Sequence, residues 1–121
     1  MLKGSLYSVV SVTQGEVNIT AELLLNKDND IFKGHFPGQP VLPGACMLQI
    51  LKEVLEDALN KKFRLKKADQ IKFLLSVDPG VSSGIKLSIA YVIEGDICAV
   101  TAVMHIAEGV CFKFKGSFVV E

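Results

Sequence analysis

The chain contains one stretch with a helical pattern of apolar residues, whereas the rest shows patterns typical of β-strands. This single helical stretch constrains the fold most. From Gly44 to about Asn60, apolar residues recur at steps of three and four, and no glycine or proline interrupts the pattern. Its first half is apolar nearly all round, which predicts that this half is buried on every side. Gln49 is the one polar side chain there. It begins a polar stripe that continues with Glu53, Glu56 and Asn60.

The rest of the chain shows strand patterns. Residues 5–13 and 17–25 are rich in β-branched and apolar residues on either side of Gln14-Gly15-Glu16, which predicts two strands joined by a tight turn. Further strands are predicted over residues 68–77, 85–93, 97–106 and 110–120, with residues 61–67 as a basic connector. We therefore predict a single α+β domain over residues 1–121, in which an antiparallel sheet wraps around one long central helix.

Composition excludes several classes of function. A formal net charge of zero argues against a strong nucleic-acid binder. No apolar run approaches the roughly 18 residues of a membrane span, and no signal-peptide pattern is present, so we expect a cytoplasmic protein. The 3 cysteines lack metal-ligand spacing and are expected to be buried, with no metal site. Half of the residues are hydrophobic, which favours an oligomer.

Residues 34–44, GHFPGQPVLPG, form a conformationally restricted segment around the imidazole of His35. Pro37, Pro40 and Pro43 leave few backbone conformations between His35 and the helix. Gly44 places free backbone N–H groups at the helix start, where the helix dipole favours developing negative charge. A carbonyl oxygen held there is polarised as an enolate forms, and a histidine can take a proton near neutral pH. The stretch therefore favours a rigid mount for a catalytic base beside a helix start that polarises a carbonyl, and a proline-rich turn whose histidine makes only a local hydrogen bond is the alternative.

The same residues resemble a known family. The signature of the (3R)-hydroxyacyl-acyl carrier protein dehydratases, the FabZ/FabA type with the hot-dog fold, is similar to residues 35–44, HFPGQPVLPG. Weaker similarity covers nearly the whole chain and includes residues 69–73, DQIKF, and 78–80, DPG. The resemblance implies a hot-dog domain that removes water from 3-hydroxyacyl thioesters in fatty-acid or lipid biosynthesis, with no metal or cofactor.

The resemblance also implies roles for single residues. In that family a histidine removes the C2 proton, a backbone N–H at the helix start polarises the thioester carbonyl, and an acid on the helix protonates the departing hydroxyl. His35 is then the base and the Gly44 N–H is the carbonyl donor. The acid falls fourteen residues after the histidine, at Gln49, whose amide supplies no proton at neutral pH. The candidate substrate-binding residues are Phe36, Pro43, Ala45 and Glu53.

Two further polar residues have competing interpretations. Glu53 lies one turn after Gln49, where many family members have glutamine, so the family's E-x-x-x-Q order is reversed. Because residues four apart share a helix face, Glu53 is a candidate to reach the pocket directly or through a water. Its place in a stripe with Glu56 favours a solvated side chain instead, and this is our expectation. For His105 we expect a strand residue that faces water or a polar neighbour.

Three functions stay open at this point. The first is a 3-hydroxyacyl-acyl carrier protein dehydratase, a hydro-lyase, impaired by Gln49; the others are a non-catalytic dehydratase-like partner subunit and a hot-dog acyl thioesterase. The resemblance implies a site at a dimer interface, so we expect a homodimer or higher oligomer, with a heterodimer as the alternative. The basic connector is either a solvated loop or a dock for the acidic acyl carrier protein. Its charges are Lys61, Lys62, Arg64, Lys66 and Lys67.

Overall fold

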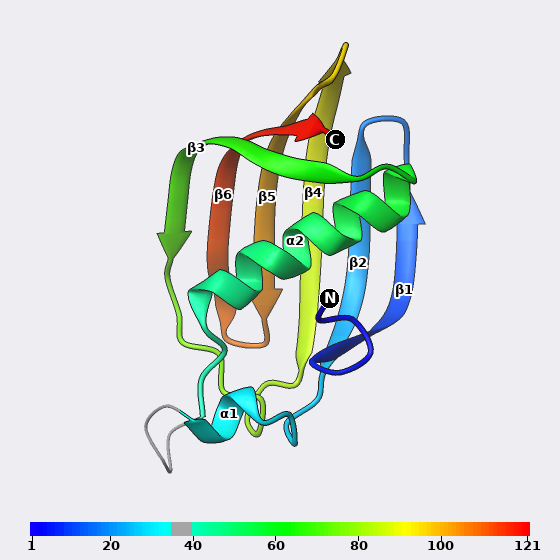
Figure 1. Ribbon diagram of the computed structural model, residues 1–121. Coiled ribbons are helices and arrows are strands. Elements are labelled where there is room, and N and C mark those ends of the chain that lie inside the picture. Colours follow the sequence, from blue (N-terminus) through cyan, green and yellow to red (C-terminus); the bar gives the residue numbers. More distant parts are fainter. Residues whose placement is uncertain (35–39) are drawn as a thin grey trace.

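The computed structural model describes residues 1–34 and 40–121, and residues 35–39 lie outside the described part. The strands are β1 (Tyr7–Gln14), β2 (Asn18–Leu25), β3 (Phe63–Phe73), β4 (Gly84–Glu94), β5 (Ile97–Ile106) and β6 (Gly109–Val120). The helices are α1 (Ile31–Gly34) and α2 (Gly44–Leu59). Within the described residues the strands form one antiparallel sheet in the order β1-β2-β4-β5-β6-β3. The sheet wraps around α2, as the sequence predicted (Figure 1).

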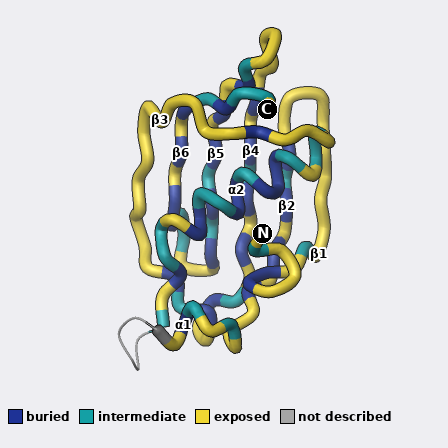
Figure 2. The backbone as a smooth tube through the Cα atoms, in the orientation of Figure 1, coloured by how far each residue is buried: buried dark blue, intermediate teal, exposed yellow. Residues whose placement is uncertain are grey.

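The core lies between α2 and the sheet face against it. Ile50, Leu51 and Leu55 of α2 are buried against inward-facing strand residues such as Leu87 and Phe114. Buried and exposed residues alternate along β2 and β4, because one face of these strands is covered and the other meets solvent (Figure 2). Each fully buried aliphatic side chain contributes roughly 1.5–3 kcal/mol. All three cysteines are buried, as predicted.

The ends of α2 agree with the prediction. Pro43 precedes the first turn in an extended conformation, with φ −62° and ψ 146°. After Leu59, Asn60 adopts the left-handed conformation, with φ 53°, and its backbone N–H donates to the Glu56 carbonyl. Asparagine tolerates this conformation better than most residues, and it is a common way to end a helix. The helix therefore begins at Gly44, the residue on which the proposed chemistry depends.

The bounds of β3 differ from the prediction. The strand runs over Phe63–Phe73 instead of residues 68–77, so most of the basic connector is strand. β-Bulges between Leu65 and Lys67 and between Ala68 and Gln70 break the alternation that would have shown the strand in the sequence. Beyond β3, residues 74–77 leave the sheet. The Val77 carbonyl there accepts a 2.8 Å hydrogen bond from the Leu42 N–H, which ties this segment to the approach of α2.

A second prediction was wrong for the single chain. The first half of α2 is not buried on every side, because the described residues leave part of its surface open to solvent. Ala45 is exposed, and Leu48 and Gln49 are only half-buried. The short helix α1 was not predicted, since four residues are too few to show a helical period. In the described ranges, neither helix is long and apolar enough to cross a membrane.

Candidate active site

The start of α2 presents backbone N–H donors that have no partner among residues 1–34 and 40–121. The first helical hydrogen bonds run from the Cys46 and Met47 N–H groups to the Pro43 carbonyl, at 3.0 and 3.3 Å. No described residue accepts a hydrogen bond from the N–H of Gly44 or Ala45. Unsatisfied N–H groups at a helix start carry partial positive charge and bind oxygen atoms that are gaining negative charge.

A cavity of about 390 Å³ adjoins this helix start. It lies between the beginning of α2, the segment before it and the residues that follow β3. Its lining is mainly apolar and consists of Val41, Leu42, Pro43, Gly44, Met47, Phe73, Leu74, Leu75 and Ser76. Two predicted site residues, Pro43 and Gly44, therefore lie on one cavity wall. Such a lining suits an apolar ligand with one polar group held at the free N–H donors.

The ring of Phe73, at the end of β3, lies against Gly44. A Cβ atom at position 44 would stand 2.6 Å from Phe73 Cζ, closer than carbon atoms approach. The ring also packs on Phe112, with 5.5 Å between centroids. Any side chain at position 44 would therefore have to displace this ring. The role of Phe73 was not predicted, although this residue lies in the segment similar to the dehydratases.

Gln49 and Glu53 form a hydrogen-bonded pair on α2. Gln49 Nε2 donates to Glu53 Oε2 at 2.9 Å. The Glu53 carboxylate also accepts from the Leu2 N–H at 2.9 and 3.1 Å and from the Lys3 N–H at 2.9 Å. The Tyr7 hydroxyl completes the set with a bond of 3.1 Å to Oε1. The carboxylate therefore ties the start of the chain to the middle of α2.

The expectation that Glu53 faces solvent was wrong. Only 1% of the residue is exposed, because the amino-terminal residues cover it. Burial by itself would raise the pKa of this carboxyl, but the hydrogen bonds from Leu2, Gln49, Lys3 and Tyr7 together lower it below its ordinary value. Glu53 is consequently a carboxylate at neutral pH and cannot replace the general acid that is missing at Gln49. A single polar stripe in the sequence could not reveal that the distant residues 2–7 cover one of its members.

The remaining predicted site residues are Ala45, His35 and Phe36, of which the structure describes only Ala45. Ala45 is exposed in the first turn of α2, on the face that it shares with Gln49 four residues later. Along the helix axis Gln49 lies about 7.5 Å from Gly44. His35 and Phe36 fall outside the described residues, so their roles stay predictions.

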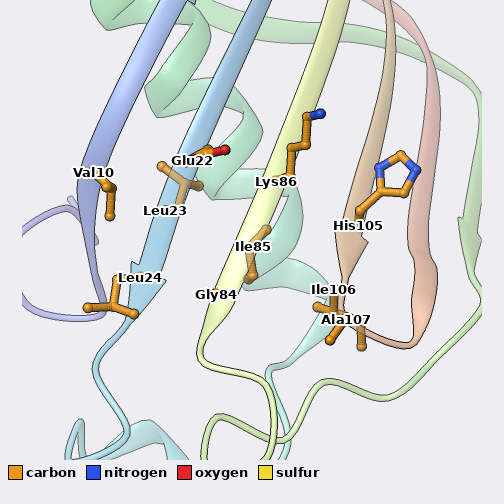
Figure 3. Close-up of a pocket in the computed structure, with 10 residues that line it drawn as sticks. All are labelled: Val10, Glu22, Leu23, Leu24, Gly84, Ile85, Lys86, His105, Ile106 and Ala107. Carbon is orange, nitrogen blue, oxygen red and sulfur yellow. The ribbon is translucent and has the colours of Figure 1, made fainter.

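A second hollow, of about 440 Å³, lies on the sheet face opposite α2 and contains none of these residues. Glu22, Lys86 and His105 line it from the neighbouring strands β2, β4 and β5, and α2 lies behind the sheet (Figure 3). His105 is a half-buried strand residue directly opposite Lys86. Its Nδ1 atom is buried and has no hydrogen-bond partner in the described part of the chain. This hollow is remote from the helix start, so His105 belongs to a different surface.

The five basic residues at the start of β3 are all exposed. Lys61 and Lys62 precede the strand, whereas Arg64, Lys66 and Lys67 belong to it. Lys67 forms a 3.3 Å ion pair with Asp69, and both side chains are largely in solvent. The strand therefore holds part of this basic surface in a fixed arrangement, which a loop would not do.

Comparisons with known proteins support the assignment of the fold. The family described as ApeI-like, ApeI dehydratase, matches residues 11–95. A curated relative, the 3-hydroxyacyl-[acyl-carrier-protein] dehydratase FabZ of Enterococcus faecalis, is 32% identical over 94% of this chain and 79% of its own length. With some other curated FabZ proteins the match spans only about half of their length.

Solved structures show the same architecture. The dehydratase heterocomplex ApeI:P from Xenorhabdus doucetiae superposes with a TM-score of 0.79 at 20% identity, over 93% of this chain and 96% of that one. A hypothetical thioesterase with coenzyme A from Streptococcus pneumoniae gives 0.66 at 11% identity, over 95% and 85%. At these identities the likeness shows the hot-dog fold alone. Together with the family match and the FabZ relative, it shows that the chain belongs to the ApeI-like family of FabZ/FabA-like hot-dog dehydratases.

Proposed function

We propose that this protein binds 3-hydroxyacyl thioesters carried by acyl carrier protein and removes water from them, in fatty-acid or lipid biosynthesis. The observation that supports this most is that Gly44 lines an apolar cavity at the helix start, where no described residue accepts from the N–H groups of Gly44 and Ala45. A thioester carbonyl bound to these donors would be stabilised as negative charge develops on its oxygen. The acyl chain would occupy the apolar cavity.

The proposed reaction uses His35 as the base. Elimination breaks the C2–H and C3–O bonds, forms the C2–C3 double bond and releases water, so the departing hydroxyl must gain a proton. Gln49 supplies no proton, and the ionised Glu53 supplies none either. General acid catalysis typically contributes about a hundred- to ten-thousand-fold in rate. We therefore expect slow dehydration by this chain alone, with the proton taken from water, and faster dehydration where a partner subunit supplies an acid.

A non-catalytic partner subunit is the second candidate. Gln49 favours it, because a related chain across a dimer interface could contribute the acid that this chain lacks. The similar structure from Xenorhabdus doucetiae is itself a dehydratase heterocomplex. The thioesterase alternative has weaker support, since it rests on fold likeness at 11% identity.

An exposed apolar edge supports assembly of either kind. β3 is at one edge of the sheet, and a run of large apolar side chains along its inner side and beyond its end is partly exposed. These residues are Leu65, Ile71, Phe73, Leu74 and Leu75, with Val41 nearby. Large exposed apolar patches often mark protein–protein contacts. We propose that a second hot-dog chain covers it, and a second copy of this chain is the simplest choice.

The basic residues at the start of β3 offer a dock for acyl carrier protein. Exposed positive charges attract an acidic partner, and added salt screens that attraction. We expect the affinity for acyl carrier protein to fall as ionic strength rises, and to fall further when Lys61 and Lys62 are both replaced by glutamate. Lys27→Glu, in the loop after β2, is a matched control that should retain the affinity.

The function is tested with purified protein and a 3-hydroxyacyl thioester of acyl carrier protein, by following enoyl absorbance. We expect slow turnover that is lost in His35→Ala. Turnover no higher than in that variant would contradict a dehydratase, and release of the free acid would indicate a thioesterase. Retained capture of acyl carrier protein by an inactive chain, together with acceleration on mixing with an active ApeI-like dehydratase, would support the partner subunit.

A further inference from the structure

We infer that Glu53 is a positioning residue: it turns the amide of Gln49 so that the carbonyl oxygen faces the acyl group, and the site thereby selects a hydroxyl at C3 over a carbonyl. The inference rests on the proposed function for the ligand. The orientation of the Gln49 amide is inferred from the hydrogen bonds of Glu53.

The orientation follows from which groups can donate. A carboxylate only accepts hydrogen bonds, so the group of Gln49 that faces Glu53 must be its NH₂ and not its carbonyl. The 2.9 Å contact from Nε2 to Oε2 has this arrangement. Because Nε2 is bound to Glu53, Oε1 remains available to accept a hydrogen bond from another group. Gln49 thus offers an acceptor on the same helix as the proposed carbonyl donor, one turn closer to it than Glu53.

The carboxylate is itself held in place. Three donors from the amino-terminal residues, the Leu2 N–H, the Lys3 N–H and the Tyr7 hydroxyl, bind its two oxygens. The side chain of Lys3 adds a 3.1 Å ion pair with Asp57 on the next turn of α2. Because every one of these partners is a donor, Glu53 must present oxygen in all directions. The Gln49 amide then has one orientation that satisfies the cluster.

This arrangement distinguishes two kinds of acyl group. A 3-hydroxyl can donate to Gln49 Oε1, whereas a 3-oxo group can only accept and would face another oxygen. In a partly buried site, two acceptors facing each other cost more than a lost contact, because neither is paired. Replacing Glu53 by glutamine allows the Gln49 amide to turn over, since an amide at position 53 can offer either oxygen or N–H. The preference for the hydroxyl should then weaken.

The first test observes the pair without any ligand. In ¹⁵N-labelled protein, the Gln49 side-chain amide, assigned with Gln49→Leu, should show one proton shifted downfield and in slow exchange with solvent. Glu53→Gln should remove this signature. Glu56→Gln is the matched control, because it removes one negative charge from the same helix without touching Gln49, and it should leave the signature unchanged. A freely exchanging Gln49 amide in the wild type overturns the inference even if Glu53→Gln fails to fold.

The second test measures binding of two stable pantetheine analogues, one 3-hydroxyacyl and one 3-oxoacyl. The wild type and Glu56→Gln should prefer the hydroxyl form by about tenfold or more. Glu53→Gln should reduce this preference to about threefold or reverse it. Equal affinities in the wild type, or an unchanged preference in Glu53→Gln, overturn the selectivity. If the wild type binds neither analogue, the proposed function fails together with the selectivity, while the amide spectrum still decides whether Glu53 holds Gln49.

Discussion

The ring of Phe73 lies so close to Gly44 that a Cβ atom there would stand 2.6 Å from Phe73 Cζ. The end of β3 therefore closes on the helix start at the residue whose N–H is the proposed carbonyl donor. The ring is 56% exposed, so it can move aside, but only by leaving its contact with Phe112.

Gly44→Ala should consequently destabilise the protein through Phe73. We expect a loss of about 1 kcal/mol in the free energy of unfolding, as the displaced ring gives up its packing. In a Phe73→Ala background the clash is absent, and Gly44→Ala should be neutral or stabilising by up to about 0.5 kcal/mol, because alanine is the better helix former. Chemical denaturation of the four proteins in this cycle measures the coupling. Equal effects in both backgrounds would show that the ring does not restrict position 44.

Stability should also depend on pH through Glu53. The folded state lowers the pKa of this carboxyl, so between the folded value and the ordinary value of 4.5 the unfolded chain binds more protons than the folded chain. The stabilisation from Glu53 is therefore fully present above pH 4.5 and is lost as the pH falls through the folded pKa.

This dependence can be measured by denaturation between neutral pH and pH 3. The free energy of unfolding should fall more steeply in acid for the wild type than for Glu53→Gln, which has no carboxylate to protonate. At neutral pH the variant should be less stable by about 1–3 kcal/mol, because charged hydrogen bonds are replaced by neutral ones. Glu56→Gln should retain the acid-dependent loss. Parallel curves for the wild type and Glu53→Gln would contradict the assignment.

The parts of the structure that local pattern controls were predictable. The 3.6-residue period of α2 and the turn at residues 94–96 predicted elements whose ends agree with those observed to within a residue or two. The predictions that were wrong concerned features that depend on contacts between residues distant in the sequence. The burial of Glu53 depends on Leu2 and Lys3, some fifty positions away, and the start of β3 was hidden by two bulges. The same holds for the site: the start of α2 at Gly44 was predictable from the local pattern, whereas its contact with Phe73 was not.

Gln49→Glu should convert the site into one with a general acid. The new carboxyl would lie beside the Glu53 carboxylate, and two carboxyls that share a site raise the pKa of one of them. A proton would then be available to the departing hydroxyl at neutral pH, and we expect dehydration to accelerate by about a hundred- to ten-thousand-fold. Enoyl absorbance in a stopped assay gives the rate.

Two controls make this result specific. Adding His35→Ala to Gln49→Glu should abolish the gain, because the C2 proton then has no base. The exchanged pair Gln49→Glu with Glu53→Gln restores the order of the resembled family, and should also be faster than the wild type. If Gln49→Glu is no faster than the wild type, the proton comes from another group, and Gln49 is not the cause of slow turnover.

The edge strand β3 gives the last prediction, which concerns assembly. Ile71 lies opposite Phe114 in the sheet register and is 37% exposed, whereas its neighbour Lys72 lies opposite Lys113 and so points to the other face. If a second chain covers the apolar edge, Ile71→Glu places an unpaired charge in that interface and should weaken association by tenfold or more, at a cost of several kcal/mol for burial. Lys72→Glu changes charge by more but lies on the opposite face, so it should leave the assembly intact. Sedimentation velocity over a range of concentrations compares the variants with the wild type. A dimer that is equally stable in Ile71→Glu would mean that the chains associate through another surface. A monomeric wild type would mean that a second copy of this chain does not cover the apolar edge.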